Sequence, residues 1–126
     1  MNYFLLAAGA IAAATTLGHF TVGARLYLRP TLEAPLDPVA RKIMHCLFHY
    51  SSVALILATS TLLYLGYQGG AGSDARLLVL FLSAQFALFG IWQLWIALTS
   101  EIQRAPLKLF QWTFFAAISV LALLGA

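Results

Sequence analysis

The stretch LLVLFLSAQFALFGIWQLWIALT, residues 77–99, determines the fold class of this chain. It contains no charged residue, and it is long enough to cross the hydrocarbon core of a bilayer, which takes about 20 apolar residues in a helix. Three further stretches have a similar apolar character, at about 3–28, 43–67 and 107–124. The sequence therefore predicts an all-α protein, a four-helix transmembrane bundle.

The composition agrees with a lipid environment, because 62% of the 126 residues are hydrophobic and only 9% are charged. A soluble domain has about a quarter charged residues, so this chain cannot cover its surface with polar groups in water. The net charge of +3 could indicate a nucleic-acid partner. The basic residues, however, flank apolar stretches and form no stripe on a soluble face, so we expect the lipid bilayer as partner and no nucleic acid.

Residues that end or start helices divide the chain. Pro30 and Pro35 are expected to end the first helix, and Asp37 followed by Pro38 is typical of an N-cap with proline in the first helical position. The glycines at 66–72 are expected to end the second helix. These signals predict a single transmembrane domain, residues 1–126, with antiparallel up-and-down helices at about 3–28, 38–67, 74–99 and 106–125.

The basic residues predict an orientation in the membrane. Six of the seven lie beside the first and third loops, namely Arg25, Arg29, Arg41, Lys42, Arg104 and Lys108. Cytoplasmic loops of membrane proteins are enriched in lysine and arginine. We therefore expect these loops in the cytoplasm and both termini outside, in an integral protein of the bacterial inner (cytoplasmic) membrane.

Three histidines are expected at the cytoplasmic end of the bundle. His19 and His49 each lie eleven residues from a proline of the first loop, which is about 16 Å along two antiparallel helices. His45 lies one turn from His49 on the same helix face. Polar groups inside a bilayer are costly, so a cluster of them is a candidate functional site. The same region is expected to gather Ser52, Trp92, Gln93 and Gln111, with Arg25 and Glu101 at its mouth.

Two kinds of cofactor fit the histidines. His45 and His49 could present two imidazoles to one transition-metal ion, with His19 as a third ligand and Glu101 or water as a fourth. Alternatively, His19 and His49 could be the axial ligands of a haem, such as haem b. A structural interpretation also stands, in which the histidines hydrogen-bond to backbone carbonyls, a neighbouring Gln or Ser, or interfacial water. A further alternative is a site for a polar ligand or a proton path.

Small residues form a face on the first helix, with Ala7, Ala10, Ala14 and Gly18 at spacings of three and four. Such faces allow transmembrane helices to approach closely. We expect this face to pack within the protomer, and a homodimer contact is the alternative.

Two segments resemble a pattern found in small bacterial four-helix membrane proteins. They are GHFTVGARLYLRPTL, residues 18–32, and HCLFHYSS, residues 45–52. In that pattern the first helix carries Gly-His and ends in Arg-Pro, and the second helix opens with a histidine after an aromatic residue. The matching pairs, in about the first half of this chain, are Gly18-His19, Arg29-Pro30 and Phe48-His49. The resemblance implies the four-helix membrane fold and marks these positions, and it implies no activity.

Three functional hypotheses follow. The first is a binding module in which His19, His45 and His49 hold a metal ion or haem for redox chemistry or metal handling. The second is a non-catalytic accessory or assembly subunit that packs against a larger membrane complex. The third is a small homo-oligomeric transporter or channel. The sequence shows no nucleophile–base pair and no phosphate loop, so we predict no catalytic residue, and an enzyme would need a bound cofactor.

Overall fold

A computed structural model describes residues 1–70 and 72–126 of the chain. Most of the described residues are helical and none of them forms a strand, so the predicted all-helical fold is confirmed. One element, η1, is a π-helix, and it joins α1 and α2 into one continuous helix. In chain order the elements are α1 (Tyr3–Gly18), η1 (His19–Leu28), α2 (Arg29–Glu33), α3 (Pro38–Gln68), α4 (Gly72–Thr99), α5 (Ala105–Lys108) and α6 (Gln111–Gly125).

Three helices are long and apolar enough to cross a membrane, namely Tyr3–Glu33, Pro38–Gln68 and Gly72–Thr99. They indicate a membrane-embedded protein, as the sequence predicts. Helix α6 is also apolar, but it has only 15 residues. At 1.5 Å per residue it is about 22 Å long, which is shorter than the roughly 30 Å hydrocarbon core of a bilayer.

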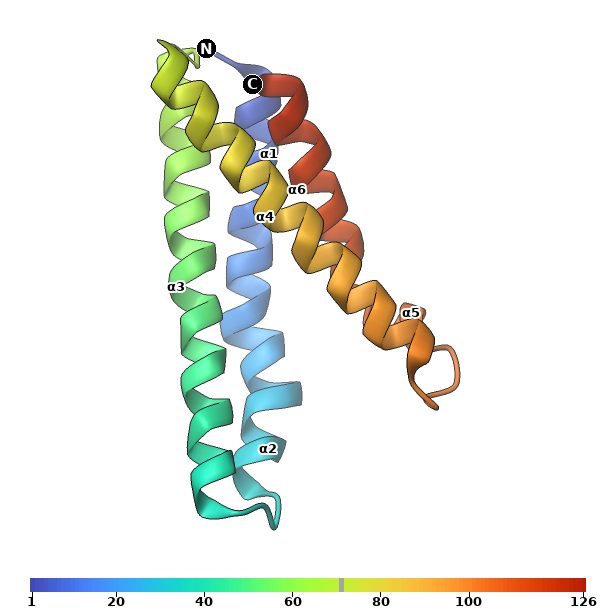
Figure 1. Ribbon diagram of the computed structural model, residues 1–126. Helices are drawn as coiled ribbons and strands as arrows, with labels where there is room; N and C mark the ends of the chain where they lie inside the picture. Colours follow the sequence, from blue (N-terminus) through green and yellow to red (C-terminus); the bar gives the residue numbers. More distant parts are fainter. Residues whose placement is uncertain (71) are drawn as a thin grey trace.

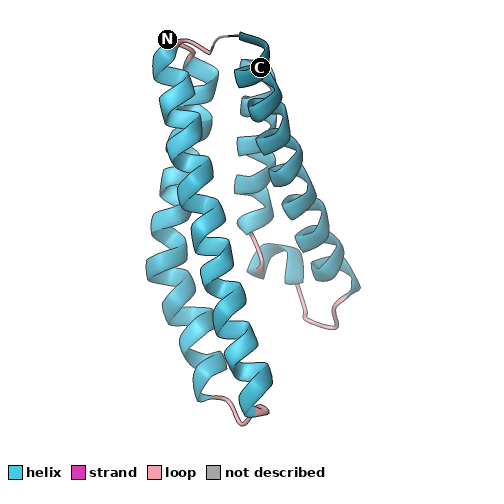
Figure 2. Cartoon of the chain, turned by 60° about the vertical axis from the view of Figure 1, so that its left-hand side comes forward, coloured by secondary structure: helices cyan, strands magenta, loops and turns pink. Residues whose placement is uncertain are grey.

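The helices lie in two pairs that diverge (Figures 1 and 2). The continuous helix α1–η1–α2 lies beside α3, and α4 lies beside α6. Helix α1 also packs against α6, which joins the two pairs near the chain termini. From there the α4–α6 pair leans away from the α1–α3 pair. The connections α2–α3 and α4–α5 therefore lie at the opposite end from the termini, and apart from each other.

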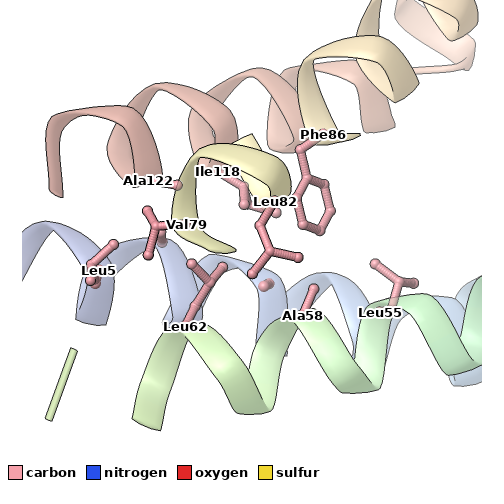
Figure 3. Packing of buried hydrophobic residues seen from close by; sticks show 11 residues of the cluster. Leu5, Leu55, Ala58, Leu62, Val79, Leu82, Phe86, Ile118 and Ala122 are labelled. Carbon is pink, nitrogen blue, oxygen red and sulfur yellow. The ribbon is translucent and has the colours of Figure 1, made fainter. Parts of the chain in front are cut away.

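The hydrophobic core fills the half of the molecule that holds the termini (Figure 3). It starts at Leu5 and Leu62 and extends to Leu55 and Phe86, near the middle of α3 and α4. Its full set is Leu5, Ala8, Ala12, Leu55, Ala58, Leu62, Val79, Leu82, Phe86, Ile118 and Ala122. Because the core ends where the pairs diverge, the other half of the bundle is not closed by packing.

Two glycines let α1 and α3 approach closely. A Cβ atom added at Gly9 would lie 2.7 Å from Leu63 Cδ2, and one added at Gly66 would lie 2.8 Å from the backbone nitrogen of Leu6. Both distances are below van der Waals contact, so a larger residue requires the helices to shift. Gly66 therefore lies inside α3 as a packing residue and does not end it, contrary to the prediction.

The small-residue face that packs is not the predicted one. Ala8 and Ala12 are buried, whereas Ala7, Ala10 and Ala14 are exposed. Helix α1 is hydrophobic on every side, so its apolar pattern does not indicate which face turns inward.

The ends of α3 agree with the prediction. Asp37 Oδ1 accepts hydrogen bonds from the backbone nitrogens of Val39, at 2.9 Å, and Ala40, at 3.1 Å, and Pro38 occupies the first turn. At the other end Gly69 adopts the left-handed conformation, with φ of 97°, that favours glycine after a helix.

The first helix continues past the predicted end at Pro30 and stops at Glu33, before Pro35. Proline lacks an N–H, and its ring collides with the carbonyl four residues earlier in an α-helix. In η1 the turns are wider, and the Arg29 N–H donates to the Ala24 carbonyl, five residues earlier. The helix goes on through Pro30, which lies in the first turn of α2, directly after this wider segment.

The predicted fourth helix is interrupted at Leu109, which has φ of −100° and ψ of 53°, outside the helical region. Side chains satisfy backbone carbonyls around the break. Gln93 Nε2 donates to the Leu109 carbonyl at 3.3 Å, and Trp112 Nε1 donates to the Pro106 carbonyl at 3.0 Å. The Gln93 contact comes from another helix, so the local sequence does not reveal it, whereas the Trp112 contact lies within the segment of the break.

Candidate functional site

A cavity of about 570 Å3 lies where the two helix pairs diverge. It is bounded by α1, η1, α3 and the first turns of α6, and it is open to the surroundings. Its walls are mostly apolar, which is the common form of a small-molecule site. The lining residues are Ala14, Thr15, Gly18, His19, Val22, Gly23, Tyr27, Leu28, Thr31, Met44, Leu47, Phe48, Ser51, Leu55, Phe110, Gln111, Phe114 and Phe115.

His19, the first residue of η1, connects the wall of the cavity to α3. Its Nε2 atom lies 2.9 Å from Ser52 Oγ and 3.1 Å from the Phe48 carbonyl oxygen. Its ring stacks on the Phe48 ring, with centroids 4.0 Å apart and an interplanar angle of 16°. His19 thus lies level with residues 48–52, the depth that the distance to the first loop predicts.

The partners of His19 indicate where its proton lies. The Phe48 carbonyl can only accept, so Nε2 must carry the hydrogen. The Ser52 hydroxyl donates to the same carbonyl at 3.1 Å, which leaves its oxygen free to accept from Nε2. In the neutral ring Nδ1 is then an acceptor, and no hydrogen bond to it occurs among the described residues. A Cβ atom built at Gly23 would lie 3.9 Å from Nδ1, in ordinary van der Waals contact, so position 23 lies directly beside this nitrogen.

A second polar chain crosses from α4 through α6 to η1. Gln93 Nε2 donates to Gln111 Oε1 at 2.7 Å, and Gln111 Nε2 donates to Tyr27 Oη at 3.1 Å. The direction of this chain is fixed at its start, because Gln93 Nε2 also donates to the Leu109 carbonyl, which can only accept. Tyr27 therefore accepts from Gln111, and its own hydroxyl hydrogen is not used in that bond.

The structure brings His45 and His49 together, one turn apart on α3. Their Nε2 atoms are 3.2 Å apart, so one ring can donate to the other. His49 packs edge-on against Phe48, with centroids 5.5 Å apart. Neither histidine lines the cavity, which therefore presents only one of the two predicted haem ligands.

The predicted metal ligands are not assembled into one group. Among residues 1–70 and 72–126, no three His, Cys, Asp or Glu side chains lie close enough to hold a metal ion. Glu101 is exposed in the connection between α4 and α5, which belongs to the helix pair that leans away from the histidines. The divergence of the pairs thus separates Glu101 from His19, His45 and His49.

The remaining predicted residues have different positions. Arg25 is exposed on η1, and Trp92 is exposed on α4 and does not line the cavity. Gln93 and Gln111 do meet, and Ser52 is buried against His19.

Sequence reasoning missed Tyr27 and the phenylalanines of α6, Phe110, Phe114 and Phe115. Tyr27 falls within the segment of the resemblance, eight residues after His19, and a tyrosine near the end of a membrane helix is typically an interfacial anchor. The phenylalanines line the cavity because α6 starts after the break at Leu109. The break determines which side of the first turns of α6 is turned toward the cavity.

Comparison of the chain with protein-family models, with curated proteins and with solved structures found no match.

Proposed function

We propose that this protein binds a lipophilic small molecule in the cavity beside His19. The observation that supports the proposal is the combination of apolar walls from three helices with a few polar side chains, among them His19 and Tyr27. Apolar walls supply affinity by burying hydrocarbon, and a few polar atoms orient the ligand. Because the cavity is open, a molecule dissolved in the bilayer can enter between the helix pairs.

We also propose the placement of this site in the membrane. In this proposal α5 and α6 together form a fourth crossing segment, the basic loops face the cytoplasm, and both termini lie outside, in a bacterial inner membrane. The excess of Lys and Arg beside the first and third loops supports it. The cavity then opens into the cytoplasmic half of the bilayer.

The test is binding of aminoanthracene, a small fluorescent lipophile, to protein purified in mild detergent. We expect saturable fluorescence enhancement with one site per chain. Ala14→Phe should weaken binding at least about tenfold, because Ala14 lines the cavity and the ring would occupy it. The matched control is Ala10→Phe, one turn earlier on α1, where the alanine is exposed but does not line the cavity. Equal binding by the two variants and the unmodified protein would count against the proposal.

A second candidate function is metal binding by His45 and His49. Two nitrogens that each lie about 2.0 to 2.1 Å from a tetrahedral zinc ion are about 3.3 Å apart. The 3.2 Å between the two Nε2 atoms is close to that spacing. The remaining ligands would be water or groups supplied by another molecule, since Glu101 lies elsewhere.

Calorimetric titration with Zn²⁺ tests this second candidate. His45→Gln and His49→Gln should each abolish binding, and His19→Gln should not. Loss of binding in His19→Gln as well would favour the larger ligand set predicted from the sequence. Zn²⁺ binding that survives in all three variants would exclude both sets.

A further inference from the structure

We infer that the cavity selects a lipid-soluble ring with a hydroxyl group at each end, the hydroquinone class, over the oxidised quinone of the same ring. This inference rests on the proposed binding of a lipophile in the cavity, and it names the chemistry of that ligand.

The walls of the cavity favour a flat ring. Phe48, Phe110, Phe114, Phe115 and Tyr27 contribute aromatic side chains from three sides, and His19 adds a further ring stacked on Phe48. Aromatic rings pack well face to face with an offset or edge to face. A flexible alkyl chain would not need this lining, whereas a planar head group gains from it.

Two of the polar side chains that line the cavity, Tyr27 and His19, have complementary hydrogen-bonding character. Tyr27 accepts from Gln111, and so its hydroxyl can donate to an oxygen of the ligand. His19 Nδ1 can only accept while Nε2 donates to the Phe48 carbonyl. A ligand that satisfies both atoms must therefore accept at the Tyr27 end and donate at the His19 end.

His19 and Tyr27 lie eight residues apart on η1, and both line the cavity, so one ligand can contact both of them.

The oxidation state follows from the donors and acceptors. A hydroquinone accepts from Tyr27 with one hydroxyl oxygen and donates to His19 Nδ1 with the other hydroxyl. A quinone has only acceptors, so its second carbonyl would face the lone pair of Nδ1. Moving the proton from Nε2 to Nδ1 would cost His19 its bond to the Phe48 carbonyl.

The experiment is displacement of aminoanthracene by trimethylhydroquinone and by trimethylbenzoquinone under argon. We expect the hydroquinone to bind about tenfold more tightly than the quinone, and durene, which lacks oxygen, to bind more weakly than the hydroquinone. Tyr27→Phe should weaken binding of both oxygenated rings about tenfold. Tyr50→Phe is the matched control, because Tyr50 is exposed on α3 and does not line the cavity. Equal affinity for the two redox forms, or a preference for the quinone, would overturn the inference.

A second measurement does not depend on a variant that folds. Nitrogen-15 NMR of labelled histidines reports which ring nitrogen of His19 carries the proton. We expect Nε2–H in the free protein and a shift of Nδ1 when the hydroquinone binds. A proton on Nδ1 in the free protein would contradict the inference. If aminoanthracene binds but the redox preference is absent, the inference fails and the proposed function stands. If aminoanthracene does not bind the cavity, both fail.

Discussion

The hydroxyl of Ser83 donates to the backbone carbonyl of Ser119, and the hydroxyl of Ser119 donates back to the carbonyl of Ser83, each at 2.8 Å. Both serines are buried, and they join α4 to α6. Burying a hydroxyl group in hydrocarbon without a hydrogen-bond partner costs free energy. Because each serine bonds to the other's backbone, two polar residues can lie at this helix contact without that cost.

Replacing either serine by alanine should destabilise the protein by about 0.5 to 1.5 kcal/mol, because interhelical hydrogen bonds in membranes are individually modest. The measurement is the free energy of unfolding in mixed detergent micelles. A double-mutant cycle should give a favourable coupling energy for the pair. Ser60→Ala, at an exposed position of α3, is the control and should have little effect. A coupling energy near zero would show that the two bonds do not act together.

Gly66→Ala should destabilise the protein by about 1 to 3 kcal/mol, the usual cost of an overpacked contact. The added methyl group would lie 2.8 Å from the backbone nitrogen of Leu6, and backbone cannot move aside as a side chain can. Gly18→Ala is a matched control, since a Cβ atom there meets nothing within 4 Å. Unfolding in mixed micelles measures both variants, and equal stabilities would contradict close packing of α1 on α3.

The sequence predicts local features of this fold well. The start of α3 follows from Asp37 and Pro38 alone, because an N-cap involves only neighbouring backbone. The common depth of His19 and residues 48–52 also follows, because it depends on distance along two helices that share a short loop. The pairing of His45 with His49 follows from helix periodicity.

Features that depend on contacts between helices could not be predicted in the same way. Helix rotation was undetermined because α1 is apolar on every side, and so Ala8 rather than Ala7 is buried. At the break, the Leu109 carbonyl accepts a hydrogen bond from Gln93, which lies sixteen residues earlier on another helix. The separation of Glu101 from the histidines depends on the angle between the helix pairs, for which the sequence contains no local signal.

The proposed orientation predicts the accessibility of single cysteines. In a Cys46→Ala background, Ser73→Cys should react with a membrane-impermeant maleimide added to intact spheroplasts, and Glu101→Cys should react only after permeabilisation. Both positions are exposed, so burial does not limit the reaction. The physical basis is the excess of Lys and Arg beside the first and third loops. The reverse pattern of labelling would show that the termini face the cytoplasm.

The bond from Gln111 to Tyr27 joins the two helix pairs at the end where they diverge, and Gln111→Leu should loosen that end of the molecule. The change also removes the acceptor for Gln93, so we expect a loss of about 1 kcal/mol in stability. In a Cys46→Ala background, spin labels at Leu36→Cys and Gln103→Cys, in the two connections, report the distance between the pairs. Pulsed electron paramagnetic resonance should show a broader distance distribution in Gln111→Leu than in the unmodified protein.

Gln68→Leu, the same substitution at an exposed position near the chain termini, should leave the distribution unchanged. A distribution equally narrow in all three proteins would mean that packing of α1 on α6 near the termini is sufficient to set the angle between the helix pairs. The hydrogen-bonded chain through Gln111 would then orient Tyr27 rather than hold the pairs together.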